Sequence, residues 1–101
     1  MHAKAPTVYI MASRRNGTLY IGVTSYLSGR NAEHKQDLIE GFTKRYGVHL
    51  LVHYQTFSTM PDAIAREKKL KKWPRAKKIA LIEATNPHWL DLTEQIADWR
   101  E

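Results

Sequence analysis

The chain has 101 residues, which fits one domain, and its 43% hydrophobic and 26% charged residues are ordinary for a globular protein. It has no cysteine, which excludes disulfides, thiolate metal sites and cysteine nucleophiles and suits a reducing cytoplasm. No apolar run approaches the ~18 residues that a membrane span needs, so no membrane partner is expected. The net charge of +6 favours a polyanionic partner, chiefly nucleic acid.

The expected elements follow each other along the whole chain without a linker or repeat. An Asn-Gly pair between two short β-like runs is a strong hairpin signal. We expect strands at residues 7–12, 18–23 and 49–57, and helices at residues 27–40, 58–72, 74–84 and 92–99. This ββαβαα order predicts a small single α/β domain over residues 1–101, with its core at about 6–92 and a three-stranded, mainly antiparallel sheet flanked by helices.

The two strands of the predicted hairpin each have one apolar face and one face with tyrosine. Alternation assigns the core to Val8, Ile10, Ala12, Leu19, Ile21 and Val23. The opposite face carries Tyr9 and Tyr20, and we expect it to be open to substrate. Gly22 beside Tyr20 removes a side chain and lets another group approach the backbone. The alternative is an ordinary aromatic cross-strand pair.

The first predicted helix places Arg30 and His34 four residues apart on one face. Its apolar stripe is expected to contain Leu27, Asn31, His34 and Leu38, and Gly41 is a candidate cap. The guanidinium fork of arginine suits phosphate, and histidine can transfer a proton near neutral pH. A surface arginine in an ion pair, beside a hydrogen-bonded histidine, is the alternative.

Glu67 has an unusual position in the helix that begins near Pro61. At 100° per residue, Ala63, Glu67 and Leu70 fall within one narrow sector, so the carboxylate points along the apolar stripe. An unpaired buried carboxylate is costly. We therefore expect Glu67 to be paired with a base, protonated or bound to a metal ion. A buried ion pair is the purely structural alternative.

The positive charge of the chain is concentrated in residues 66–78, which hold eight of its sixteen Lys and Arg and one acid, Glu67. The candidate nucleic-acid contacts in this block are Lys68, Lys69, Lys71, Lys72, Arg75, Lys77 and Lys78. The alternative is a solvated helix face. Trp73 within the block is expected to pack in the core rather than stack on a base.

Taken together, these residues resemble the GIY-YIG nuclease family. Its two name-giving tripeptides correspond to Val-Tyr-Ile at residues 8–10 and Tyr-Ile-Gly at residues 20–22. The family's Arg and His match Arg30 and His34, its glutamate matches Glu67, and an asparagine near the end matches Asn86. The resemblance covers roughly residues 6–92 and is greatest to small bacterial single-domain members. Two residues depart from it: Val8 replaces the first glycine of the name, and Gly29 stands where relatives commonly carry a bulkier residue.

The resemblance implies a metal-dependent endonuclease that acts on DNA, single- or double-stranded and possibly branched. It implies that Tyr9 activates the attacking water, that Arg30 holds a phosphate oxygen, and that Glu67 holds Mg²⁺ or Mn²⁺. His34 could accept the proton of Tyr9, or a nearby cation could lower the pKa of Tyr9. Tyr20 would bind water or phosphate with Gly22 making room, and Asn86 would shape the site, chiefly as a structural hydrogen-bonding residue. The bacterial cytoplasm is the expected location, and DNA repair, recombination and defence against incoming DNA are all compatible with the sequence.

Two other classes of function compete with this hypothesis. The first is a non-catalytic nucleic-acid-binding module with the same fold and basic block. The second is an interaction protein whose acidic residues 79–101 contact a partner or the chain's own basic block. A pure nucleic-acid binder does not need a carboxylate such as Glu67 on an apolar helix face, which favours the nuclease.

Overall fold

The computed structural model describes residues 4–38 and 41–97 and has a three-stranded sheet at its centre. Its strands are β1 (Thr7–Ala12), β2 (Leu19–Thr24) and β3 (Leu50–Thr56). The strand order is β2-β1-β3, and β1 pairs antiparallel with both neighbours. The predicted antiparallel α/β fold is therefore confirmed, with each strand bound shifted by at most one residue.

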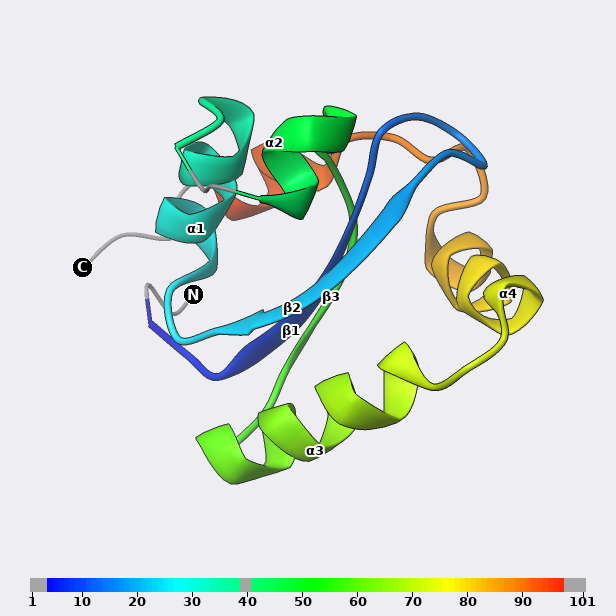
Figure 1. Ribbon diagram of the computed structural model, residues 1–101. Coiled ribbons are helices and arrows are strands. Elements are labelled where there is room, and N and C mark those ends of the chain that lie inside the picture. Colours follow the sequence, from blue (N-terminus) through cyan, green and yellow to red (C-terminus); the bar gives the residue numbers. More distant parts are fainter. Residues whose placement is uncertain (1–3, 39–40, 98–101) are drawn as a thin grey trace.

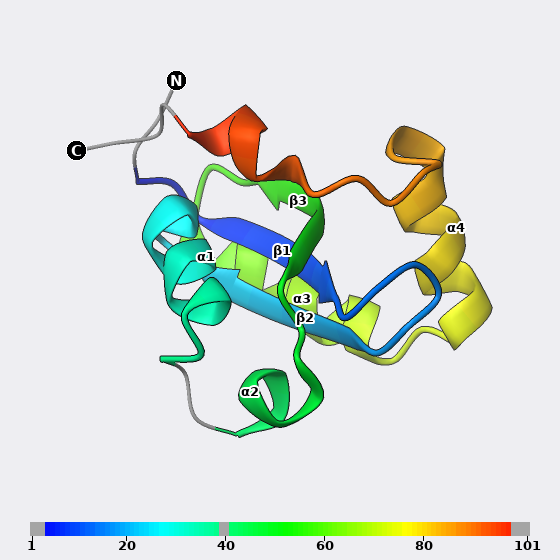
Figure 2. The same ribbon diagram turned by 90° about the horizontal axis from the view of Figure 1, so that it is seen from above.

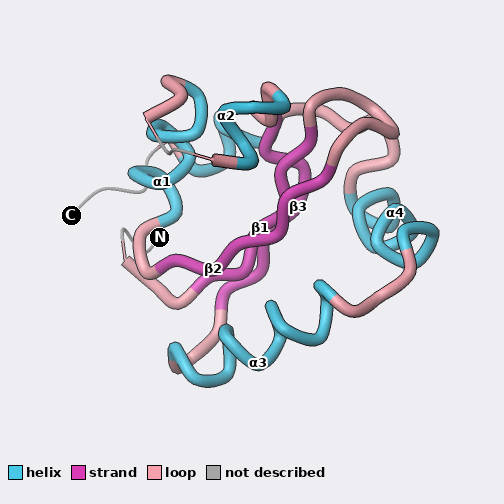
Figure 3. The backbone as a smooth tube through the Cα atoms, viewed as in Figure 1, coloured by secondary structure: helices cyan, strands magenta, loops and turns pink. Residues whose placement is uncertain are grey.

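Helices cover both faces of this sheet. They are α1 (Leu27–Lys35), α2 (Phe42–Tyr46), α3 (Met60–Lys71), α4 (Arg75–Thr85) and the 3₁₀ helix η1 (Leu92–Ile96). Figures 1 and 3 show α1 and α2 on one side of the sheet and α3 on the other, and Figure 2 shows η1 running above β3. None of the described helices combines the length and the apolar character that crossing a membrane requires.

The two layers of helices create two hydrophobic cores. Val8 and Ile10 pack with side chains of α3 and α4, as the alternation predicted. Tyr9 and Met11 lie in a second core, with Leu27 of α1. The expectation that the tyrosine face is open was therefore wrong for Tyr9. Every residue of β1 is buried, because a central strand covered on both faces has no solvent side.

The first helix ends five residues earlier than predicted. Asp37 adopts a left-handed conformation with φ of 55°, and its N–H donates to the carbonyl of His34 while Leu38 N–H donates to that of Glu33. These two bonds form a Schellman motif, which satisfies the last carbonyls of a helix. Leu38 consequently leaves the predicted stripe and is 65% exposed. Gly41 begins α2, a helix that the sequence did not predict, instead of capping α1.

The later helices agree closely with the predicted ones. Thr59 caps α3 by accepting from the N–H of Asp62, and Pro61 lies in its first turn, where a proline costs no hydrogen bond. The expected C-terminal helix at 92–99 is a 3₁₀ helix that ends at Ile96, and residues 98–99 lie outside the described part of the chain. Asp91 caps it through the N–H of Thr93.

Candidate active site

Tyr9 lies on the central strand, opposite Gly22 of β2 and Tyr54 of β3. Only 2% of its surface is exposed. A Cβ atom on Gly22 would lie 2.5 Å from both the Cζ and the hydroxyl oxygen of Tyr9. Glycine is therefore needed here because the ring of Tyr9 fills the space over the backbone. The sequence had suggested that substrate would use this space, and the structure instead fills it with Tyr9.

Three rings from three different elements meet on the α1 side of the sheet. The hydroxyl of Tyr9 lies 3.0 Å from Nε2 of His34, and both side chains are buried. The ring of Tyr20 is 6.2 Å from that of Tyr9 and 5.4 Å from that of His34, centroid to centroid. The predicted set of Tyr9, Tyr20 and His34 is thus brought together as one cluster. Leu27 and Asn31, on the same stripe of α1 as His34, are buried as predicted.

Burial keeps the central pair of this cluster neutral. The pKa of the Tyr9 phenol is raised above its usual value, first by burial and then by the neighbouring Tyr20, while the charge of Arg30 opposes the rise. The pKa of His34 is lowered from 6.5 by burial and by Arg30. At neutral pH the pair is therefore a phenol beside an uncharged imidazole, which has a free lone pair for a proton.

Arg30 stands at the solvent side of the cluster. Its side chain is 44% exposed, and its Nε lies 3.6 Å from a carboxylate oxygen of Glu33. An exposed pair of this kind contributes little to stability, so the guanidinium can exchange it for a phosphate. The preceding Gly29 has a local explanation, because a Cβ there would lie 2.5 Å from Cε2 of Tyr26.

Glu67 reaches the same region from α3, on the other side of the sheet. Ala63 and Leu70 are buried and the Glu67 side chain is 14% exposed, so the predicted position on the apolar stripe is confirmed. Its Oε2 lies 3.1 Å from Nζ of Lys71, one helical turn away. The charge of Glu67 contributes to the raised pKa of Tyr9. Charges of both signs, Arg30 and Glu67, therefore act on a neutral phenol.

The donor set around Glu67 suits a hard cation that is held mainly by water and substrate. Among the described residues no group of three or more His, Cys, Asp or Glu could enclose a metal ion. Mg²⁺ typically uses one or two carboxylates and completes its shell with waters and phosphate oxygens. Glu67 fits that requirement, because it is a mostly buried carboxylate whose ion-pair partner among the described residues is the half-exposed Lys71.

The predicted basic side chains do not form one uniform surface. Lys71 and Lys78 flank an open pocket of about 290 Å³ that Leu19, Tyr20 and Ile21 also line. This pocket connects part of the basic block to a member of the tyrosine cluster. Lys68, Lys69 and Lys72 are exposed on α3.

Two other basic residues of the block make contacts within the protein. Arg75 Nη2 donates to the carbonyls of Asn16 and Gly17, at 2.7 and 2.6 Å, and so ties α4 to the hairpin turn. Lys77 Nζ lies 4.2 Å from the centroid of the Trp73 ring, a cation–π contact. Trp73 is partly buried against the core of α3 and α4, as expected.

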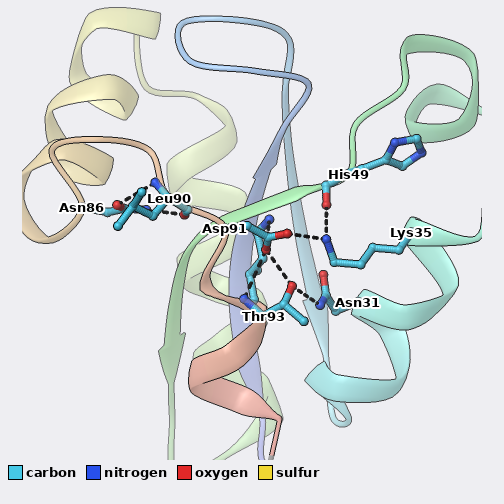
Figure 4. A network of polar contacts seen from close by, with 8 residues as sticks. Asn31, Lys35, His49, Asn86, Leu90, Asp91 and Thr93 are labelled. Carbon is cyan, nitrogen blue, oxygen red and sulfur yellow. Dashed lines mark hydrogen bonds and ion pairs between the residues drawn. The ribbon is translucent and has the colours of Figure 1, made fainter.

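Asn86 has a structural position beside β3. Its Nδ2 donates to the carbonyl of Val52. Its Nδ2 also donates to the carbonyl of Leu90, and its Oδ1 accepts from the N–H of Leu90 (Figure 4). These bonds fasten the turn after α4 to the edge strand. The side chain thus has protein partners at both polar atoms, and we assign it a role in holding this turn.

Sequence reasoning missed two groups of polar residues near the cluster. The Oγ1 atom of Thr43, in α2, lies 3.2 Å from Nδ1 of His34. A second group joins α1 to η1, in which Asp91 accepts from Lys35 and Thr93, and Asn31 donates to Thr93 (Figure 4). Only the Asp91–Thr93 contact is local; the contacts that join these residues to α1 span 9 to 62 positions along the chain, which no local pattern encodes.

The comparison with protein families identifies the class. The model described as the GIY-YIG catalytic domain matches residues 5–80. The chain belongs to the GIY-YIG family, as the resemblance predicted, and the match includes the residues of the ring cluster, Arg30 and Glu67. Asn86 and Asp91 lie after the matched range.

Individual relatives are small bacterial proteins. The chain is 33% identical over 76 residues to a UPF0213 protein of Staphylococcus haemolyticus and 34% identical over 77 residues to one of Staphylococcus aureus; each match covers 75% of this chain and 92% of the relative. It is also similar to the solution NMR structure of the UPF0213 protein BH0048 from Bacillus halodurans, with a TM-score of 0.54 and 25% identity over 88% of this chain and 94% of that one.

Proposed function

We propose that this protein is a metal-dependent endonuclease that hydrolyses phosphodiester bonds in DNA. The observation that carries the proposal is the buried hydrogen bond between the Tyr9 hydroxyl and His34, where the charges of Arg30 and Glu67 both act on the phenol. A phenol joined to a neutral imidazole is a path for a proton, and the flanking charges suit a phosphate and a cation. Membership of the GIY-YIG family supports a nuclease-type reaction.

The first role in this mechanism is to activate water. Tyr9 would take a proton from the attacking water as its own proton passes to Nε2 of His34. Because the pKa of Tyr9 is raised, a standing phenolate is not available at neutral pH, and transfer to His34 removes the need for one. The water oxygen then bonds to phosphorus, the bond to the leaving oxygen breaks, and that oxygen takes a proton from solvent.

The second role is to stabilise the charge of the transition state. Arg30 would hold a non-bridging phosphate oxygen through its guanidinium fork. Tyr20 would orient the water or the phosphate from β2. Glu67 would hold Mg²⁺ or Mn²⁺, releasing Lys71 from the ion pair. When bound, the ion polarises the phosphate and stabilises the leaving oxygen.

The third role is to attract the strand. Lys71 and Lys78 border the pocket beside Tyr20, so they would bind a phosphate next to the scissile one. The exposed lysines of α3 would add attraction that depends on salt. Cleavage and binding would then occur on one surface, between the hairpin and α3.

The test is a cleavage assay on single-stranded, double-stranded and branched DNA, and on RNA, with Mg²⁺, Mn²⁺ or excess chelator. Wild-type protein is expected to cleave DNA only with the metal, and Glu67→Ala should lose cleavage while it retains DNA binding. Glu94→Ala on the exposed side of η1 is the matched control and should cleave normally. Cleavage in chelator, or full activity of Glu67→Ala, would contradict the proposal. Binding without cleavage by the wild type would favour a nucleic-acid-binding module.

A further inference from the structure

We propose that Thr43 is a positioning residue that sets the tautomer of His34, so that Nε2 carries no proton and can accept one from Tyr9. Its catalytic consequence rests on the proposed nuclease function. The tautomer itself is a property of the folded chain that is measured without substrate. Thr43 belongs to α2, the helix that the sequence did not predict.

The geometry places His34 between two hydroxyl groups. Nδ1 lies 3.2 Å from Oγ1 of Thr43, and Nε2 lies 3.0 Å from the hydroxyl of Tyr9. His34 is 1% exposed and Thr43 is 3% exposed, so water does not replace either partner. A neutral imidazole has one N–H and one lone pair. It must therefore donate to one hydroxyl and accept from the other.

The two hydroxyls differ in acidity, and this difference decides the direction. The phenol of tyrosine has an ordinary pKa of about 10, whereas the alcohol of threonine does not titrate in water. The more acidic hydroxyl is the better donor to a nitrogen lone pair. Tyr9 thus donates to Nε2, and the Nδ1–H of His34 donates to Oγ1 of Thr43.

The surroundings of His34 keep its imidazole neutral. The tautomer then decides which ring nitrogen can accept a proton. Arg30 and Glu33 face it from α1, Tyr9 and Tyr20 from the strands, and His49 lies before β3. Burial and the charge of Arg30 lower its pKa, whereas Glu33 opposes them. A His34 that receives the proton of Tyr9 keeps acceptors for both N–H groups, Thr43 on one side and the Tyr9 oxygen on the other.

The backbone holds Thr43 in this position. Its carbonyl accepts from the N–H of Val48 at 3.0 Å, and α2 ends at Gly47, whose φ is 62°. Without Oγ1, an Nδ1–H would be buried with no partner, which is costly. The ring would then favour the Nε2–H tautomer, which donates to Tyr9 and cannot accept its proton.

The direct experiment measures the ¹⁵N chemical shifts of His34 in the full-length protein near neutral pH, without metal or DNA. The wild type and Thr43→Ser are expected to show protonated Nδ1 and unprotonated Nε2. Thr43→Val should show a large shift toward the Nε2–H form. Thr7→Val is the matched control, because Thr7 is equally buried but donates to the carbonyl of Ala5. A wild-type Nε2–H tautomer, or no change in Thr43→Val, would overturn the inference.

A kinetic measurement extends the test to the proposed reaction. Single-turnover cleavage by Thr43→Val should be slower by about 10²-fold with little change in KM, the lower end of the usual effect of acid–base groups, and Thr43→Ser should restore the rate. If Thr43→Val does not fold, the wild-type and Thr43→Ser spectra still decide the tautomer. The expected spectra with no cleavage by the wild type would refute the nuclease and leave the tautomer assignment standing.

Discussion

A single hydrogen bond of 3.0 Å joins the hydroxyl of Tyr9 to Nε2 of His34, two residues that are 25 positions apart in the sequence. The phenol is held at the middle of the sheet, and the imidazole is held by α1. Neither partner can rotate to solvent, because both side chains are buried. In the proposed mechanism this pair would supply an oriented acceptor for the proton that leaves the attacking water.

Tyr9→Phe should slow single-turnover cleavage by about 10²–10⁴-fold, the usual scale of general acid–base catalysis. The substitution retains the ring but leaves Nε2 of the buried His34 without this partner, so the free energy of unfolding should fall by about 1–3 kcal/mol. Tyr54→Phe is the control, because Tyr54 is the cross-strand neighbour and its hydroxyl donates to Gln95. Equal rates for Tyr9→Phe and the wild type would show that another group activates the water.

The rate should also increase with pH over an interval below 6.5. His34 must be neutral to accept the proton, and its pKa lies below 6.5 because of burial and Arg30. Protonation at lower pH therefore removes the acceptor and slows cleavage. A pH profile of single-turnover rates measures this dependence. Because Arg30 lowers the pKa of His34, Arg30→Gln should move the rising part of the profile toward higher pH. A rate independent of pH from 4 to 7 would contradict the role of His34.

Gly22→Ala should destabilise the protein and lower the rate. The new methyl group would lie 2.5 Å from the buried Tyr9 side chain, and overpacking of a core costs about 1–3 kcal/mol. Gly29→Ala is an informative comparison, because its methyl group would meet the ring of the half-buried Tyr26, and alanine favours a helix. Urea unfolding should therefore show a clearly larger loss for Gly22→Ala. An equal loss would mean that Tyr9 adjusts freely.

Asp91→Asn should make the stability of the protein less dependent on pH. Burial tends to raise the pKa of Asp91, but hydrogen bonds from Lys35 and Thr93 outweigh it and lower the pKa below 3.8. The bonded carboxylate thus stabilises the fold fully above about pH 4, and this contribution is lost as the pH falls through the lowered pKa.

Urea unfolding at pH 7 and pH 3 measures this effect. Asp91→Asn should cost about 1 kcal/mol at pH 7, and the difference from the wild type should shrink at pH 3. Asp62→Asn in the exposed first turn of α3 serves as the control carboxylate. A difference that stays constant from pH 7 to pH 3 would show that the charge of Asp91 is not what fastens η1 to α1.

Reversing the charge of Lys68, Lys69 and Lys72 should weaken DNA binding and flatten its salt dependence. Each phosphate contact that is lost reduces the slope of log K against log salt by about 0.9 for duplex DNA. These three lysines are exposed on α3, and leaving Lys71 in place preserves the ion pair with Glu67. Binding titrations at several salt concentrations measure the slope. Affinity that is unchanged at low salt would place the contact surface elsewhere.

The sequence by itself determined the order of the elements apart from α2, the sheet and the composition of the first core. Alternation assigned Val8 and Ile10 to one face, and the Asn-Gly turn identified the hairpin, because both signals depend on neighbours within a few residues. Helical periodicity likewise placed Glu67 on a buried stripe between Ala63 and Leu70. The family resemblance then grouped Tyr9, Arg30, His34 and Glu67 by their order and spacing along the chain.

Only the tertiary structure decided what surrounds these residues. The second layer of helices buries Tyr9. Residues 8–12 form a continuous hydrophobic run, which is typical of a strand covered on both faces, but the alternation argument did not use this signal. The end of α1 depends on Asp37 in a left-handed conformation, which is held by a bond of 2.8 Å to His49, twelve residues away. Thr43 and Asp91 meet the α1 residues His34 and Lys35 for the same reason: long-range packing, which local periodicity does not encode, brings them together.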